Sequence, residues 1–177
     1  MKCFFKTFFL ILFTIQTCFA QEYLYILNDG CILDLYSNAI KYFENSPILV
    51  IKDPHGLLLR FEILDISNDC KSLSSDTYKK VRYIEQFLAK MNNPVIIEVH
   101  VNEIPKECAI EHKRWEISTL IANNIESVML IPKGKLARNK IHSVGFGEFL
   151  PPKNTSNNGG NYVNRVDIMI LCDVNGE

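Results

Sequence analysis

The sequence predicts an α/β (α+β) sandwich, in which a mixed β-sheet packs against helices. Three observations lead to this prediction: apolar runs typical of strands, segments with apolar residues at helical spacing, and the alternation of these two kinds of segment along the chain. A final apolar run closes the series with one more strand, so the sheet is expected to be mixed and covered by helices.

Residues 1–20 have the pattern of a cleavable secretory signal. Two lysines precede the apolar segment FFLILFTI, which is short for a bilayer span, and Ala20 supplies a small residue before Gln21. We therefore expect export to an oxidising space, a bacterial periplasm. The tetrapeptide ending at Cys18 also resembles a lipoprotein signal, although its Gln and Thr are unusual there. Lipidation at Cys18 would tether the protein to a membrane, with the outer membrane as the alternative location.

The remaining chain has the length of one domain with a single sizeable core. Its formal net charge of −1 argues against a dedicated surface for nucleic acid or anionic lipid, so no nucleic-acid partner is expected. No later stretch has the length and apolar character of a transmembrane helix.

Four cysteines follow the signal: Cys31, Cys70, Cys108 and Cys172. An even number in an exported chain favours two disulfides, for which three connectivities are possible. A metal site is the rival interpretation, but the chain has no CxxC or paired His-Cys spacing. Isolated buried thiols are the third possibility. We expect no metal and no cofactor.

Residues 21–46 form a leader to which the sequence assigns no role. YLYILNDG predicts a strand ending in a turn, and the segment after it predicts an amphipathic helix. The apolar positions at helical spacing are Leu33, Tyr36, Ala39, Ile40 and Phe43.

Two apolar runs flank Asp53-Pro54-His55-Gly56, which predicts two antiparallel strands joined by a reversal. A polar loop, SNDCKSLSSD, follows, and Ser74, Ser75 or Asp76 can cap the next helix. That helix is expected to bury one stripe: Tyr78, Val81, Ile84, Leu88 and Met91. Asn92-Asn93-Pro94 ends it, and PVIIEVH predicts the next strand.

A second helix is expected from about Glu116 to Ile131, ended by Pro132 and Gly134. Its apolar positions are Ile117, Leu120, Ile121, Ile125, Val128 and Met129. KIHSV then predicts a short strand, FLPPKNTSNNGGNY a loop, and VDIMILC the last strand.

Four segments resemble one family in sequence order. They are HGLLLRFEI, PVIIEVHVNE, RWEISTLIA, and IHSVGFGEFLPP followed by NRVDIMI. The last is the most specific, because its glycines, Pro, Arg and alternating strand fall in the family's order. The chain thus resembles the OmpA-like domain, the peptidoglycan-associated module of OmpA, Pal and MotB. The resemblance implies an OmpA-like domain over 47–177 with the order β-α-β-α-β-β.

The resemblance also implies a ligand site. The family recognises the ammonium and free carboxylate of a diamino acid in the peptidoglycan stem peptide, which requires an acid and a guanidinium. The acid position falls on Glu103, the position before it on Asn102, and the Arg position on Ile121. Losing one charge-assisted pair costs about 1.5–3 kcal/mol, or at least roughly tenfold in affinity. Ile121 also shares the apolar stripe of its helix, so it is expected to pack inward.

Two arginines could alter this site. Arg114 is a possible substitute for the missing cation, although it is expected to precede the helix. Arg165 matches an Arg of the family's last motif and is a candidate ligand residue. The alternative, which we prefer, is an exposed residue at the strand entry or an ion pair that pins a loop, for instance with Glu148. His100 and His142 are expected to be ordinary strand residues.

If the OmpA-like topology holds, the loops carrying Cys70 and Cys108 lie at the same end of the sheet. A Cys70–Cys108 disulfide would then fasten the ligand loop and leave Cys31 to pair with Cys172. In the chain-entropy model such a bridge stabilises by about 4 kcal/mol. Cys108 and His112 are the nearest nucleophile–base pair, but Cys108 is expected to be oxidised, so no enzyme is predicted.

Two functions remain. The first is a peptidoglycan-binding module that anchors a protein to the cell wall through the stem peptide. The second is a structural subunit of an envelope-spanning complex, such as a secretion system or a motor, that uses the OmpA-like fold for protein contacts. The family resemblance favours the first function, and Ile121 favours the second.

Overall fold

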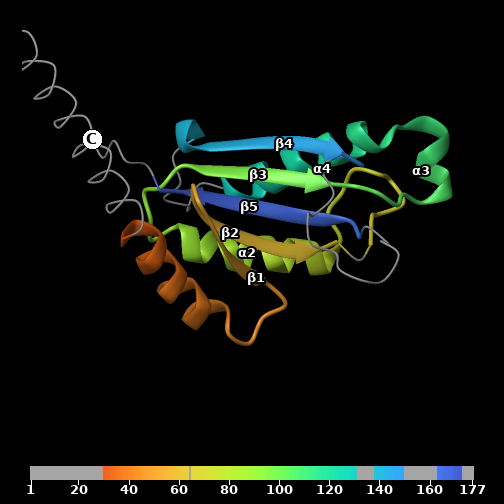
Figure 1. Ribbon diagram of the computed structural model, residues 1–177. Helices are drawn as coiled ribbons and strands as arrows, with labels where there is room; N and C mark the ends of the chain where they lie inside the picture. Colours follow the sequence, from red (N-terminus) through yellow and green to blue (C-terminus); the bar gives the residue numbers. More distant parts are fainter. Residues whose placement is uncertain (1–29, 64, 131–137, 150–162, 173–177) are drawn as a thin grey trace, which may run out of the picture.

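The computed structural model describes residues 30–63, 65–130, 138–149 and 163–172, and these form one mixed sheet with helices on one face (Figure 1). The strand order is β1-β2-β5-β3-β4. The elements are β1 (Leu49–Asp53), β2 (Gly56–Glu62), α2 (Ser75–Leu88), β3 (Val95–His100), α3 (Lys106–Glu111), α4 (Arg114–Met129), η1 (Arg138–Lys140), β4 (Ile141–Gly147) and β5 (Arg165–Leu171). The predicted α/β sandwich with a mixed sheet is confirmed.

The sheet is mixed because only β3 and β4 run parallel. Strand β5 lies between β2 and β3 and is antiparallel to both, and β1 forms the predicted hairpin with β2. Side chains alternate between the two faces, so one set of strand residues faces α2 and α4 and is almost fully buried. On the three inner strands this set is Leu57, Leu59, Phe61, Val95, Ile97, Val99, Val166, Ile168 and Ile170.

Helix α2 has one of its expected N-caps, but the face that it buries differs in part from the predicted apolar stripe. The Ser74 hydroxyl accepts a hydrogen bond from the Thr77 amide, which selects Ser74 among the three candidate caps. Tyr78 is exposed, contrary to prediction, and Met91 lies beyond the helix end. The buried positions are Thr77, Val81, Ile84, Glu85, Phe87 and Leu88.

Helix α4 begins at Arg114, two residues earlier than predicted, and ends at Met129. Ile121 and Ile125 are buried in the core, as the stripe predicted. Helix α3 was not predicted. It has six residues and little apolar pattern.

Residues 30–43 form an N-terminal helix that belongs to the same core. Leu33 and Ile40 are exposed, contrary to the expected stripe, and the buried face consists of Ile32, Leu35, Ala39 and Phe43. The rings of Tyr42 and Phe43 contact Tyr83 and Phe87 of α2 at centroid distances of 4.9–5.3 Å. The strand expected before this helix lies outside the described residues.

Two disulfides confirm the pairing that the family topology implied. Cys31 of the N-terminal helix is bonded to Cys172, which directly follows β5. Cys70 is bonded to Cys108 of α3. Among the described residues no helix combines the length and apolar character needed to cross a membrane.

Gly145 of β4 is required by the close approach of α4. A Cβ at this position would lie 2.2 Å from the Thr119 amide nitrogen and 2.6 Å from Ser118. We predict that Gly145→Ala destabilises the domain by about 1–3 kcal/mol, because the helix backbone must move away from the sheet. Urea unfolding measures this loss.

The control is His142→Ala, which changes an exposed residue of the same strand and is expected to alter stability by less than about 0.5 kcal/mol. Equal unfolding midpoints for Gly145→Ala and the unsubstituted protein would contradict the predicted clash.

Candidate functional site

A pocket of about 670 Å³ lies where the parallel strands β3 and β4 end. The loop after β3, helix α3, the first turn of α4 and the residues after β4 form its walls. Its lining carries acids, bases and aromatic rings: Glu103, Glu148, Lys106, Lys113, Arg114, Trp115 and Phe149. It can therefore contact both charges of a zwitterion, and Trp115 and Phe149, which are 50% and 64% exposed, add apolar surface.

The side chain of Asn164, the residue directly before β5, holds the loop after β3. Its Oδ1 accepts hydrogen bonds from the amides of Asn102 and Glu103 at 2.7 and 2.9 Å. Its Nδ2 donates to the Glu103 carbonyl at 2.7 Å. These three bonds fix the backbone of Asn102 and Glu103, while the Glu103 carboxylate is exposed at the pocket.

Arg114 brings a cation to the same pocket. It is the first residue of α4, not a residue before the helix as expected. Its Nε donates to the Asn102 carbonyl at 2.6 Å, and its Nη1 is paired with the Glu148 carboxylate. Because a guanidinium has five N–H donors, other donors remain for a ligand carboxylate.

The residue at the family's Arg position takes no part in the pocket. Ile121 is 3% exposed, lies seven residues after Arg114, and packs in the core between α4 and the sheet. The cation that contacts the loop after β3 therefore stands at the start of α4, whereas the family's Arg position lies about two turns further along the helix.

Arg165 is not the exposed strand-entry residue that the sequence suggested, and Glu148, the example partner, does not pair with it. It is buried on β5, its Nε lies 3.2 Å from Asp167, and it is not among the residues that line the pocket. Burial lowers the pKa of Arg165, and the neighbouring Asp167 carboxylate opposes this effect. Glu148 pairs with Arg114 instead, because both lie at the pocket while Arg165 belongs to the sheet.

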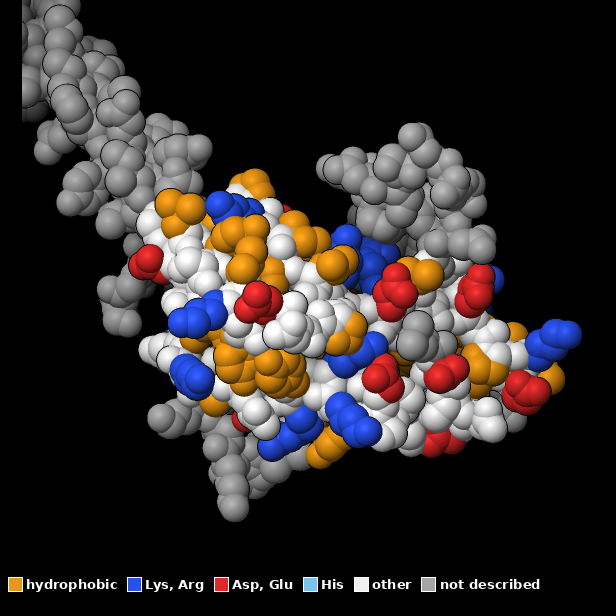
Figure 2. All heavy atoms as spheres, turned by 90° about the horizontal axis from the view of Figure 1, so that it is seen from below, with side chains coloured by type: hydrophobic (Ala, Val, Ile, Leu, Met, Phe, Trp, Pro, Cys, Tyr) orange, Lys and Arg blue, Asp and Glu red, His pale blue; other side chains and the backbone are white. Residues whose placement is uncertain are grey.

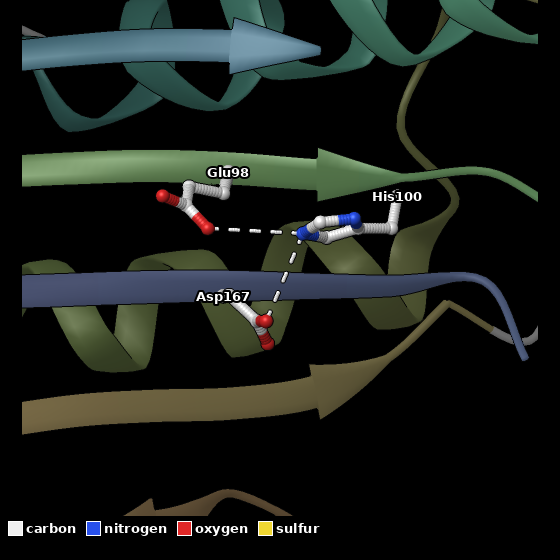
Figure 3. A group of neighbouring side chains, drawn as sticks. All are labelled: Glu98, His100 and Asp167. Carbon is white, nitrogen blue, oxygen red and sulfur yellow. Dashed lines mark ion pairs between the residues drawn. The ribbon is translucent and has the colours of Figure 1, made fainter. Parts of the chain in front are cut away.

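A second charged cluster lies on the sheet face opposite α2 and α4. The Nε and Nη2 of Arg60 donate hydrogen bonds to the two carboxylate oxygens of Asp167 at 2.6 and 2.7 Å. This hydrogen bonding raises the pKa of Arg60. The buried Nε2 of His100 has no hydrogen-bond partner among the described residues, and it lies 3.8 Å from both Glu98 and Asp167 (Figure 3). The His100 Nδ1 donates to the Phe149 carbonyl at 3.1 Å.

Glu98, His100 and Asp167 have the donor atoms of a metal site, and these atoms lie within 4.8 Å of one another. However, Asp167 already accepts from Arg60 and Arg165, and a divalent cation would stand beside both guanidiniums. The cluster is therefore better described as an ion-pair network. One local signal was available, because Glu98 and His100 are two residues apart on β3 and so share a face of the sheet. Asp167 lies on β5, and only the strand pairing brings it beside them.

Helix α3 forms one wall of the pocket and is attached to the rest of the domain mainly through Cys108. Cys108 is the single buried residue among those of α3 whose side chains are described, and it is bonded to Cys70. Cys70 has a left-handed φ of 61° in a turn organised by Asp69. The Ser67 and Ser72 hydroxyls and nearby amides donate to this carboxylate and lower the pKa of Asp69. Since Cys108 is oxidised, it offers His112 no thiol to activate.

Comparisons with known proteins identify the fold. No family model and no curated protein matches the chain. Among solved structures, a MotB-like protein from Desulfovibrio vulgaris has 16% identity and a TM-score of 0.66, covering 85% of this chain and 96% of that one. An outer membrane protein from Borrelia burgdorferi B31 has 26% identity and a TM-score of 0.51, covering 71% and 97%.

The cell wall anchor of the T6SS from Pseudomonas aeruginosa has 14% identity and a TM-score of 0.59, covering 80% of this chain and 97% of that one. These likenesses show that the chain has the OmpA-like fold that its motifs implied.

We predict that replacing Cys70 and Cys108 together by Ser releases α3, because a six-residue helix is unstable in water without tertiary anchorage. Loss of the cross-link is expected to cost about 2–4 kcal/mol. Hydrogen exchange over 104–111 measures the local effect and should become faster.

The matched control replaces Cys31 and Cys172 by Ser, which removes the other disulfide at the far end of β5. Exchange over 104–111 should stay at its original rate in this variant. Unchanged protection of α3 without the Cys70–Cys108 bridge would show that other contacts hold the helix.

Proposed function

We propose that this protein is exported to the cell envelope and that its OmpA-like domain, 47–177, binds peptidoglycan without a covalent bond. The observation that carries this proposal is the presence of Glu103 and Arg114 in one pocket at the end of β3. Solved structures with the same fold include MotB periplasmic domains and a cell wall anchor, which supports a role at the cell wall.

The pocket suits the zwitterionic diamino acid of a stem peptide. The Glu103 carboxylate would accept hydrogen bonds from the ligand ammonium, and the remaining Arg114 donors would bind its carboxylate, helped by Lys106 and Lys113. Acidic side chains gather toward the end of the molecule that carries α3 in the view of Figure 2, and they would attract the ammonium group. Arg165, a candidate from the sequence, has no place in this scheme because it lies outside the pocket.

The second candidate function is a structural subunit of an envelope-spanning complex. Two observations favour it: Arg114 is already paired with Glu148, and Ile121 replaces the cation of the family pattern. Ile110 of α3, which is 85% exposed, offers apolar surface for a protein partner.

Purified cell-wall sacculi distinguish the two functions. We predict that the unsubstituted domain co-sediments with sacculi and that Glu103→Gln and Arg114→Gln each lower the affinity at least about tenfold, because each removes one charge-assisted hydrogen bond. Arg138→Gln, in η1 and outside the pocket, is the control and should bind like the original protein.

Thermal melting of each variant separates a loss of binding from a loss of folding. If the unsubstituted domain stays in the supernatant, the structural-subunit function is favoured instead. Binding that is insensitive to both substitutions would place the peptidoglycan site elsewhere.

We propose that 1–20 is a signal peptide and that 21–46 leads into the domain in the periplasm. The two disulfides support an oxidising compartment. Mass spectrometry of the exported protein should give a chain that starts at Gln21. A chain starting with a lipid-modified Cys18 would contradict this and place the protein on a membrane.

A further inference from the structure

The N-terminal helix starts near one end of the sheet, and α3 with the loop after β3 lies at the other end (Figure 1). Because α3 and this loop line the pocket, the helix start and the pocket are at opposite ends of the sheet. Strand β5 runs between these two ends, and each of its termini is fastened to one of them. At one end Cys172 is bonded to Cys31 of the N-terminal helix. At the other end Asn164 holds the pocket loop through three hydrogen bonds. One strand therefore connects the helix to the pocket.

The helix end of β5 is also secured by backbone contacts. The Cys172 amide donates to the His55 carbonyl in the β1–β2 turn at 3.0 Å, and the Leu171 amide donates to the Pro94 carbonyl at 2.9 Å. The Asn93 side chain donates to the Leu171 carbonyl, also at 2.9 Å. The disulfide is thus attached to a fixed point of the sheet rather than to a loose chain end.

Along its length β5 is held on both sides. It forms seven residue pairs with β2 and six with β3. Its own inward side chains, Val166, Ile168 and Ile170, are fully buried in the core. By contrast, the direct chain route from the N-terminal helix leads to β1. That strand is an edge strand with five residue pairs, and its Leu49 is 61% exposed.

These two routes respond differently to tension. A pull on Cys31 through the chain alone would detach the N-terminal helix and then β1, one contact after another. A pull that passes through the disulfide reaches β5 and acts along the strand axis. Because β3 is antiparallel to β5, opposite pulls on Cys172 and on the loop after β3 load the hydrogen bonds of the ladder together.

We propose that β5 is the tension-transmitting strand of an anchor. The Cys31–Cys172 disulfide directs force from the N-terminal side past the helix and β1 into β5, and Asn164 passes it to the pocket loop. This inference rests on the proposed function, since a module that holds the cell wall at its pocket must resist a pull from its other end.

Optical tweezers test the proposal, with one handle at the N-terminus and the other at an azide-bearing amino acid introduced at Glu103. The oxidised protein should show no early release of the helix. The variant with Cys31→Ser and Cys172→Ser should show an added step at lower force. Residues 31 to 48 have a contour length of roughly 60 Å, and the step should equal this length less their end-to-end distance in the folded state. Asn164→Ala should lower the first rupture force without this step.

The variant with Cys70→Ser and Cys108→Ser is the matched control, because it also lacks one disulfide but should show no helix step. Should the Cys31 and Cys172 variant fail to fold, adding reductant to the folded, tethered protein gives the same comparison. Identical traces with and without the Cys31–Cys172 bridge would overturn the proposal. No ligand is used, so this result is independent of whether the pocket binds peptidoglycan.

Discussion

The insertion of β5 between β2 and β3 is the constraint on which the rest of the structure depends. Residues 165–171 pair with 56–62 and with 95–100, so the two halves of the sheet meet only through this late strand. Its inward side chains complete the core, and its ends supply Asn164 and Cys172. Such non-local pairing is slow to form, which makes completion of the sheet dependent on the C-terminal part of the chain.

The charged side chains on the outer face of β5 fit this constraint. Arg60, Asp167 and Glu98 stand opposite one another across three strands. A slip of β5 by one residue would turn Asp167 to the core face and away from Arg60. Buried ion pairs contribute little net stability, because desolvation offsets their attraction. We interpret the Arg60–Asp167 pair as a determinant of register, which in turn places Asn164 beside the pocket loop.

The sequence was informative where periodicity or topology constrains the chain. The hairpin, α2, α4 and the closing strands followed from apolar spacing, and the disulfides followed from the family's topology. Helix α3 could not be predicted, because its attachment is Cys108 rather than an apolar stripe. Glu148, named from the sequence as an example partner for Arg165, pairs instead with Arg114. Arg165 and Asp167 are two residues apart on β5, so the alternation of side chains along a strand places them on the same face, a local signal that the sequence analysis did not use.

The position of Arg114 at the start of α4 favours the binding of an anion in the pocket. A cation at the first residue of a helix opposes the helix dipole, so Lys113 and Arg114 stand where positive charge is least favourable for α4. Glu148 and the Asn102 carbonyl offset part of this cost by binding the guanidinium. The remaining positive potential at the pocket is reduced by any bound anion. A carboxylate ligand would thus stabilise α4 as well as fill the pocket, and this links ligand binding to the stability of the helix that carries Ile121 in the core.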